Sequence, residues 1–305
     1  MSRPLQSAMP TRRAAPSAWA MARTVLGLFK LRIGMLIMLT ALVGAAITPG
    51  PALGPARYLV LALSVLVASA SAGAFNQYHE RGSDRLMART RQRAFATGAV
   101  RASPAWLLLA AALLAAAVAA ACLVLNPASA AFVFLGAFFY AIVYTVWLKR
   151  RTRWNIVVGG LAGSFAVLAG GCAVAPVPSA LPLLLALVLF LWTPPHFWAL
   201  AIACRDDYRA AGIPMLPVVA GNAAAARAVL ASTLALLLVS LLPLACGAGP
   251  VYGVGALAGG SLFVARAVAL VRTPDDRRVA TACFFASLVQ LSVLLLAATL
   301  DAMAG

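Results

Sequence analysis

The chain has 305 residues, of which 64% are hydrophobic and only 10% are charged, and its formal net charge is +17. Soluble domains are usually about half apolar and a quarter charged, so this composition excludes an ordinary soluble protein. The apolar residues form long unbroken runs, whereas a membrane β-barrel would have short alternating segments. The expected fold class is all-α, a polytopic bundle of transmembrane helices.

Nine apolar runs approach the roughly 20 residues that a transmembrane helix needs. They cover residues 33–49, 57–76, 105–124, 130–148, 156–175, 180–202, 226–247, 251–271 and 279–300. The adjacent prolines Pro194 and Pro195 predict a kink or break in the sixth run. Residues 1–22 are basic and rich in Pro and Ala, and we expect them to be disordered. Residues 23–305 then form a single transmembrane domain.

The basic residues are distributed asymmetrically. With nine spans, all 24 Lys and Arg residues except Arg57 fall on one side of the membrane. The positive-inside rule then places the N-terminus in the cytoplasm and the C-terminus outside. The same charges could attract an anionic substrate, whereas no nucleic-acid partner is expected. The five cysteines are dispersed without metal or redox spacing, so we interpret them as packing residues.

The stretch "NQYHERGSDRLMARTRQR" places polar residues at the inner end of the second run. If the helix continues, Asn76, Glu80 and Asp84 share one stripe that rises about 12 Å. Gly82 weakens the helix by about 1 kcal/mol, so a turn could open there. The stretch is either a solvated helix end with internal ion pairs, or a site where oxygen ligands hold Mg²⁺ and basic residues hold a phosphate.

A second acidic cluster, Asp206 and Asp207 in "CRDDYRAAG", follows the sixth run on the same membrane face. Four of the seven acids of the chain fall in these two clusters. Together they could hold two Mg²⁺ ions bridged by a diphosphate, with Lys149 and Arg150 neutralising its outer oxygens. Alternatively, the two aspartates are solvated and paired with neighbouring arginines.

A neutralised diphosphate is a good leaving group, and an allylic isoprenoid would leave a stabilised carbocation. The apolar bundle would exclude water while an electron-rich acceptor attacks. His196, in "WTPPHFWAL", lies between Trp192 and Phe197, where a flat aromatic acceptor would fit. A lone histidine in an apolar helix is nevertheless more often a hydrogen-bonded structural residue. His79 is expected to face away from the acidic stripe.

These motifs, with "YTVWLKRRTRWNIVVGG" and "RDDYRAAGIPMLPVV", resemble the UbiA-type membrane prenyltransferases, and within them the protoheme IX farnesyltransferase (heme O synthase) branch. The resemblance runs from about Leu28 onward. It implies nine helices, with an active site that opens at the cytoplasmic face of the cell inner membrane. The chain departs from the family pattern at three positions: members usually carry a proline at Leu31, an acid at Gly82 and a proline at Ala94.

The resemblance also implies residue roles. Asn76, Glu80 and Asp84 would hold Mg²⁺ and farnesyl diphosphate, and Asp207, with Asp206 beside it, would be the second acidic motif. The remaining positions implied to contact substrates are Arg89, Arg93, Tyr144, Lys149, Arg150, His196 and Tyr208. The implied reaction adds farnesyl to a vinyl group of heme b and water supplies a hydroxyl. The product, heme o, would pass to a downstream heme a synthase for terminal oxidases.

Two other functions stay open on the sequence. One is a related prenyltransferase with another aromatic acceptor, such as a quinone precursor. The other is a non-catalytic transporter or heme-handling membrane protein. Transporters usually place functional polar groups near the bilayer midplane, and here these groups lie at the membrane boundary, which disfavours transport.

Overall fold

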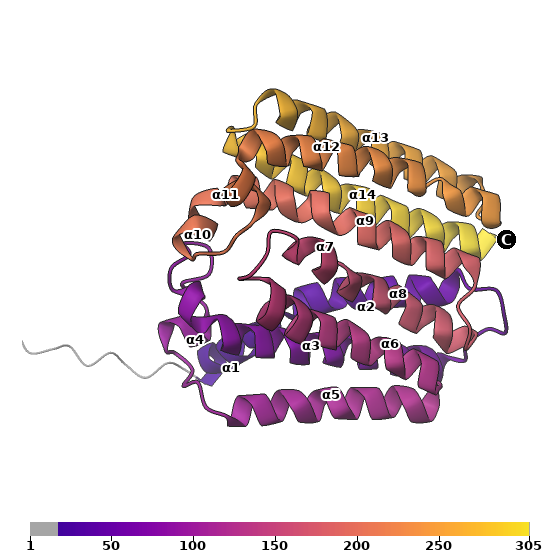
Figure 1. Ribbon diagram of the computed structural model, residues 1–305. Helices are drawn as coiled ribbons and strands as arrows, with labels where there is room; N and C mark the ends of the chain where they lie inside the picture. Colours follow the sequence, from indigo (N-terminus) through magenta and orange to yellow (C-terminus); the bar gives the residue numbers. More distant parts are fainter. Residues whose placement is uncertain (1–17, 305) are drawn as a thin grey trace, which may run out of the picture.

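A computed structural model describes residues 18–304, and all regular structure in that range is helical (Figure 1). The helices are α1 (Ala18–Leu28), α2 (Leu31–Ala46), α3 (Pro55–Asp84), α4 (Ala94–Thr97), α5 (Ala105–Val124), α6 (Pro127–Phe138), η1 (Phe139–Leu148), α7 (Asn155–Gly159), α8 (Leu161–Val174), α9 (Ala180–Ala203), α10 (Arg205–Ala210), α11 (Leu216–Ala220), α12 (Asn222–Val239), η2 (Leu242–Cys246), α13 (Pro250–Arg272) and α14 (Arg277–Ala304).

The expected multi-pass helical architecture is confirmed. Eight helical stretches in the described range are long and apolar enough to cross a membrane, and α1 with α2, bent by 44°, makes a ninth. The break expected at Pro194 and Pro195 is absent, because α9 continues through both buried prolines. Helix α1 begins at Ala18, so residues 18–22 are helical; residues 1–17, the rest of the segment expected to be disordered, lie outside the described range.

Helix α3 continues through the first acidic motif. Its 30 residues give a length of about 45 Å, which exceeds a hydrocarbon core of about 30 Å. A helix that enters the core at Pro55 leaves it about 20 residues later, near Phe75. The motif from Asn76 to Asp84 therefore lies at the membrane boundary, and Gly82 does not interrupt the helix.

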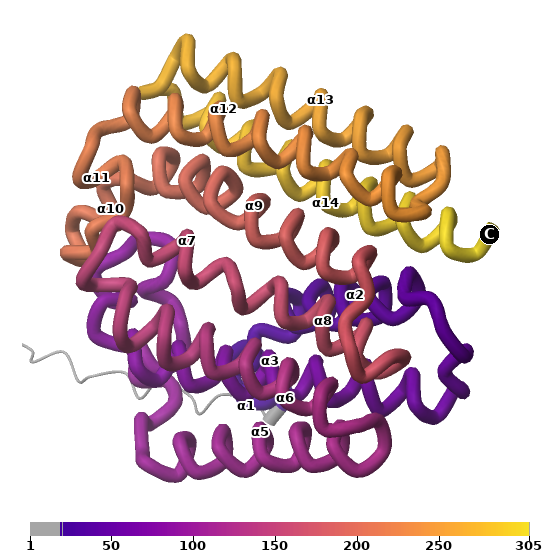
Figure 2. The backbone as a smooth tube through the Cα atoms, turned by 45° about the vertical axis from the view of Figure 1, so that its right-hand side comes forward, coloured from indigo at the N-terminus to yellow at the C-terminus, as the bar shows by residue number. Residues whose placement is uncertain are grey.

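The helices form two packed groups that meet at α8 (Figures 1 and 2). In one group α2, α3 and α6 contact α8, and α5 packs on α3 and α6, around a core that is mostly alanine. The other group joins α9, α12, α13 and α14 around larger side chains such as Phe263 and Leu294. Helix α8 contributes Ala166 and Ala169 to the first core, and Val167 and Leu168 to the second.

The contact between α2 and α8 depends on two glycines. A Cβ atom at Gly170 would overlap the backbone carbonyl of Ala41, and one at Gly44 would overlap the carbonyl of Val167. Small residues allow such close approach of helix backbones, which is the main source of packing energy between membrane helices. This crossing fixes α2 against α8, and both helices contribute residues to the lining of the cavity described below.

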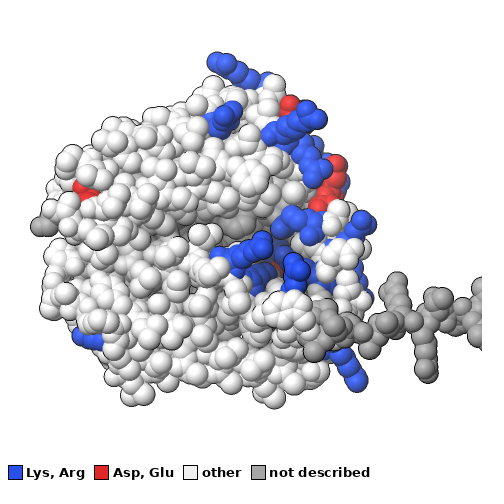
Figure 3. Space-filling model, turned by 180° about the vertical axis from the view of Figure 1, so that it is seen from behind, with Lys and Arg blue, Asp and Glu red and all other residues white. Residues whose placement is uncertain are grey.

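The charged residues gather at one end of the molecule. Figure 3 shows most Lys and Arg side chains along one edge, where they surround a hollow in the surface. The same edge holds the last turns of α3 and the short helices α4, α10 and α11 (Figure 1). Arg57, at the other end of α3, donates a 3.1 Å hydrogen bond to the carbonyl of Leu125. We call the charged edge the polar rim.

Candidate active site

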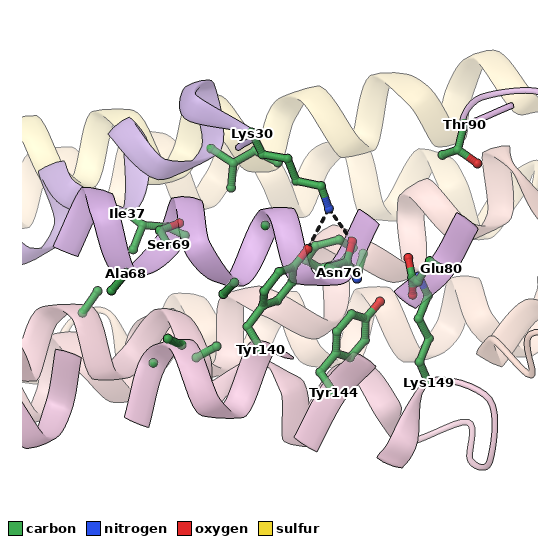
Figure 4. Close-up of a pocket in the computed structure, with 18 of the residues that line it drawn as sticks. Lys30, Ile37, Ala68, Ser69, Asn76, Glu80, Thr90, Tyr140, Tyr144 and Lys149 are labelled. Carbon is green, nitrogen blue, oxygen red and sulfur yellow. Dashed lines mark hydrogen bonds and ion pairs between the residues drawn. The ribbon is translucent and has the colours of Figure 1, made fainter. Parts of the chain in front are cut away.

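A cavity of about 210 Å³ extends inward from the polar rim between α2, α3, α6, η1 and α8. One end is lined by apolar and small side chains, including Ile37, Val65 and Phe132, and the other by charged and hydroxyl groups. The residues of α3 that line it recur on a single face, from Val65 to Asp84. In Figure 4 this face runs from Ala68 at the apolar end to Glu80 at the polar end. The shape suits an amphiphile with an anionic head and a long apolar tail.

The structure brings together the stripe expected from the first motif. Asn76, Glu80 and Asp84 all line the cavity, and each is at most 4% exposed. Glu80 forms a buried ion pair with Lys149. Asp84 accepts hydrogen bonds of 2.9 and 3.0 Å from Arg93. Ion pairing of this kind allows carboxylates to stay charged inside a protein, because isolated buried charges are very costly.

The π-helix η1 forms the wall opposite α3. Its backbone hydrogen bonds join each N–H to the carbonyl five residues earlier, as in the 2.9 Å hydrogen bond from the Lys149 N–H to the Tyr144 carbonyl. This wider register brings Tyr140, Tyr144 and Lys149 to the cavity together. The two tyrosine rings stack with centroids 5.9 Å apart. Thr145, on the same helix, accepts a 3.0 Å hydrogen bond from the Asn76 amide nitrogen, which leaves the amide oxygen toward the cavity.

The sequence analysis missed Lys30, which lines the cavity from the break between α1 and α2. Its ammonium group donates to Asn76 Oδ1 at 2.5 Å and to the Tyr140 hydroxyl at 3.0 Å (Figure 4). A signal was available, because only two of the 24 basic residues are lysines, Lys30 and Lys149, and both line the cavity. A lysine presents a compact point charge, whereas the planar arginine fork needs more room.

The loop between α3 and α4 covers the polar end of the cavity. It contributes the lining residues Met87, Arg89, Thr90 and Arg93. Its backbone is held from α10, because the Ala88 and Arg89 N–H groups donate to the carboxylate of Asp207 at 3.1 and 3.3 Å. Asp207 thus contacts the outer side of the loop and does not line the cavity.

Two further residues, Asp206 and Arg150, lie elsewhere than the motifs suggested. Asp206 is 93% exposed and pairs with Arg209 at 3.2 Å, so it does not join Glu80 in one chamber. Arg150 donates to Ser83 Oγ at 2.9 Å and does not line the cavity. The expectation of two acidic clusters in a shared chamber therefore fails, because α10 turns its carboxylates toward the loop and solvent.

His196 is likewise outside the cavity. Its Nδ1 atom lies 2.6 Å from Ser287 Oγ on α14, and its ring stacks on Trp192 with centroids 4.1 Å apart. These contacts bury His196 between α9 and α14, which supports the structural interpretation of this histidine. Its neighbour Phe197 does line the cavity. His79 is exposed and stacks on Phe75, as expected for a residue that faces away from the stripe.

Tyr208 is the residue of α10 that does reach the cavity. It is buried with Met87 and Ile213 in a small core that supports the loop. Burial raises the pKa of the Tyr208 phenol, so the hydroxyl stays protonated and can donate a hydrogen bond at neutral pH. Tyr208 and Arg89 therefore place two donors at the mouth of the cavity.

The charges at the polar end favour a metal–diphosphate ligand. Four basic residues, Lys30, Arg89, Arg93 and Lys149, outnumber the two carboxylates, which gives the lining a formal net charge of +2 when both lysines are protonated. Within residues 18–304, no three His, Cys, Asp or Glu side chains converge as a complete metal site. Mg²⁺ does not need one, since it binds one or two carboxylates together with substrate phosphates and water. The oxygens of Asn76, Glu80 and Asp84 fit that requirement.

Comparison with known proteins agrees with this geometry. Residues 37–289 match the model of the UbiA prenyltransferase family. The chain is 54% identical to protoheme IX farnesyltransferase 2 of Paramagnetospirillum magneticum, over 92% of this chain and 96% of the relative. It is 35% identical to protoheme IX farnesyltransferase of Granulibacter bethesdensis, over 98% of this chain and 95% of the relative.

Solved structures share the fold at low identity. A structure of digeranylgeranylglyceryl phosphate synthase superposes with a TM-score of 0.77 at 17% identity, covering 93% of this chain and 99% of that one. A UbiA homolog from Archaeoglobus fulgidus, bound to GPP and Mg²⁺, gives a TM-score of 0.67 at 16% identity, covering 89% and 99%. With the cavity and the bundle described above, these matches establish that the chain is a multi-pass membrane prenyltransferase that belongs to the UbiA prenyltransferase family.

Proposed function

We propose that the chain transfers the farnesyl group of farnesyl diphosphate to a vinyl group of heme b and adds water, giving heme o. The observation that carries the proposal is a single cavity with a cationic, carboxylate-bearing end and an apolar end. The diphosphate lies at the first end and the isoprenoid chain at the second. The choice of farnesyl and heme follows the names of the relatives in Paramagnetospirillum and Granulibacter.

The residues of the polar end bind and activate the donor. Asn76, Glu80 and Asp84 would hold Mg²⁺, and the bound ion would supply positive charge that neutralises the diphosphate. Lys149, Arg93 and Arg89 supply hydrogen bonds to its oxygens, because charge-assisted bonds to phosphate are among the strongest in proteins. The Tyr140 and Tyr144 rings line the same cavity, and we expect them to face the carbon from which the diphosphate departs. Their π-faces favour the positive charge that develops there.

The reaction replaces the carbon–oxygen bond of farnesyl diphosphate with a carbon–carbon bond to heme b and a new hydroxyl group. The bond between C1 of the farnesyl group and oxygen breaks, and the electron pair leaves with the diphosphate. C1 then bonds to the terminal vinyl carbon of heme b, and the positive charge moves to the vinyl carbon next to the ring. Water adds to that carbon and loses a proton, which leaves a hydroxyl group. The apolar walls around Phe132 and Val133 delay water until the carbon–carbon bond has formed.

We place the chain in the cell inner membrane with its N-terminus in the cytoplasm, its C-terminus outside and the polar rim facing the cytoplasm. The support is the distribution of basic residues, which all lie on one side apart from Arg57. In this orientation the cavity opens to soluble farnesyl diphosphate. The product heme o stays in the bilayer, where a downstream heme a synthase can take it.

The test is the mass of heme extracted from membranes that contain the chain, after incubation with Mg²⁺, farnesyl diphosphate and heme b. The expected product has the mass of heme b plus one farnesyl group and one hydroxyl group. The matched reaction uses a longer prenyl diphosphate and hydroxybenzoate. Product from the second reaction alone would replace the heme proposal with a quinone-precursor prenyltransferase. Product from neither would favour a non-catalytic heme-handling protein.

A further inference from the structure

Each oxygen ligand on the α3 stripe is held by a different cation. Lys30 contacts the Asn76 oxygen at 2.5 Å, Lys149 pairs with Glu80, and Arg93 contacts Asp84 at 2.9 Å. The three cations come from separate segments: the α1–α2 break, the end of η1 and the loop before α4. All of them line the same cavity. The atoms suited to a metal ion are thus occupied by positive side chains.

The position of Lys30 is enforced by its surroundings. Lys30 has φ of 49° and ψ of 41°, and it is the single non-glycine residue with positive φ between residues 18 and 304. Such conformations are costly and persist only where neighbouring structure imposes them. Gln77 imposes this one by donating hydrogen bonds of 2.8 and 3.1 Å to the carbonyls of Gly27 and Leu28, which ends α1.

Gly73, one turn before Gln77, completes the support. A Cβ atom there would lie 3.2 Å from the Phe29 carbonyl and 3.4 Å from Cβ of Lys30. The bare backbone of α3 therefore lets the break approach closely and aims Lys30 along the face that carries Asn76. Three positions on this part of α3, Gly73, Asn76 and Gln77, together place one ammonium group on one amide oxygen.

These contacts set up a competition for the same oxygens. A metal ion bound alone would displace Lys30, Lys149 and Arg93 into a largely apolar cavity with no anion to receive them. A diphosphate bound alone would draw the cations away from Glu80 and Asp84 and leave two carboxylates near its own charge. Unpaired charges in such surroundings are strongly unfavourable. When both ligands bind, every charge gains an opposite partner.

We propose that Lys30, with Lys149 and Arg93, occupies the ligand oxygens before substrate binds and moves to the phosphate oxygens when Mg²⁺ and diphosphate bind together. The proposal rests on the prenyl-transfer function and adds Lys30 to its diphosphate-binding residues. It makes the binding of Mg²⁺ and of diphosphate mutually dependent, and such coupling is reciprocal. After transfer, the three cations return to their oxygens and weaken the hold on the released diphosphate.

The experiment measures two dissociation constants by calorimetry, on the full chain in detergent micelles: MgCl₂ alone, and preformed magnesium pyrophosphate. The variant is Lys30→Met, which keeps the length of the side chain and removes its charge. Because the variant removes the ammonium group that competes for the Asn76 oxygen, it is expected to bind Mg²⁺ alone about tenfold more tightly. Because it also loses a charged hydrogen bond to the diphosphate, it is expected to bind magnesium pyrophosphate about tenfold or more weakly. Lys30→Arg keeps the charge and is expected to restore the second affinity in part.

The control is Arg32→Gln, an exposed basic residue two positions away that does not line the cavity. It is expected to change neither constant. Changes in opposite directions distinguish the proposal from damage to the fold, because damage would weaken the binding of both Mg²⁺ and magnesium pyrophosphate. Two dissociation constants that rise together, fall together or both stay unchanged in Lys30→Met would overturn the proposal. No prenyl group or heme is present, so a chain that shows this coupling but makes no heme o would refute only the proposed function.

Discussion

The apolar end of the cavity predicts which prenyl chain the protein accepts. Ala72 and Ala68 are 3% exposed and line the cavity on the same face of α3 as Glu80. At 1.5 Å per residue they lie about 12 and 18 Å from Glu80 along the helix. One isoprene unit adds four carbon–carbon bonds of about 1.5 Å, or about 5 Å of extended chain. A farnesyl tail therefore ends about 15 Å from its diphosphate, between the two alanines.

Ala72→Leu is expected to exclude the third isoprene unit while admitting the first two. Each buried CH₂ group contributes about 0.8 kcal/mol, so loss of a five-carbon unit costs about 4 kcal/mol. This corresponds to nearly a thousandfold change in the ratio of kcat/KM for farnesyl over geranyl diphosphate. Ala68→Leu is expected to leave farnesyl transfer largely intact and to exclude only longer chains.

The assay compares donors of two, three and four isoprene units in membranes containing each variant, with product masses as the readout. Ala70 provides a control, because it is 6% exposed on α3 but does not line the cavity. Ala70→Leu can lower the amount of folded protein without changing the donor ratio. If Ala72→Leu keeps the wild-type ratio of farnesyl to geranyl transfer, the tail does not lie along α3 and this assignment of the cavity is wrong.

Three further predictions concern the polar end. Asp84→Asn removes a carboxylate oxygen from the Mg²⁺ site and is expected to lower kcat about a hundredfold or more, while size-exclusion elution in detergent stays unchanged. Asp207→Ala removes two charge-assisted bonds to the loop backbone and is expected to raise KM for the prenyl diphosphate about tenfold and to expose the loop to protease. Asp206→Ala changes an exposed side chain and is expected to alter neither quantity; an equal loss in both variants would contradict the loop-anchoring role. Gly159→Ala places a Cβ 2.8 Å from Cδ2 of Tyr144, so it is expected to displace that ring and lower kcat more than it changes KM, as measured in steady-state kinetics.

Features that depend only on residues close together in the sequence could be predicted from it. Apolar run lengths gave a multi-pass helical bundle, and the helical period placed Asn76, Glu80 and Asp84 on one stripe. Both follow from the rise and pitch of a single helix, and the structure confirms the bundle and continues α3 through the motif. The motifs and the family resemblance together pointed to eight of the residues that line the cavity. The charged ones among them stood out because cations and acids are rare in membrane segments unless they have a function.

The pairing of these groups was decided by the tertiary structure. Lys30 donates a hydrogen bond to Asn76, which lies 46 residues away in the sequence, and Lys149 pairs with Glu80, which lies 69 residues away. No local pattern determines which cation reaches which oxygen, because this depends on how α2, α3 and η1 pack. The same reason explains Asp207 and His196: each lies in a motif that suggests chemistry, but α10 turns one toward a loop backbone and α14 buries the other against Ser287. The sequence alone thus determined the helices and the residue types at their ends, whereas the packing between helices decided which of those residues share one cavity.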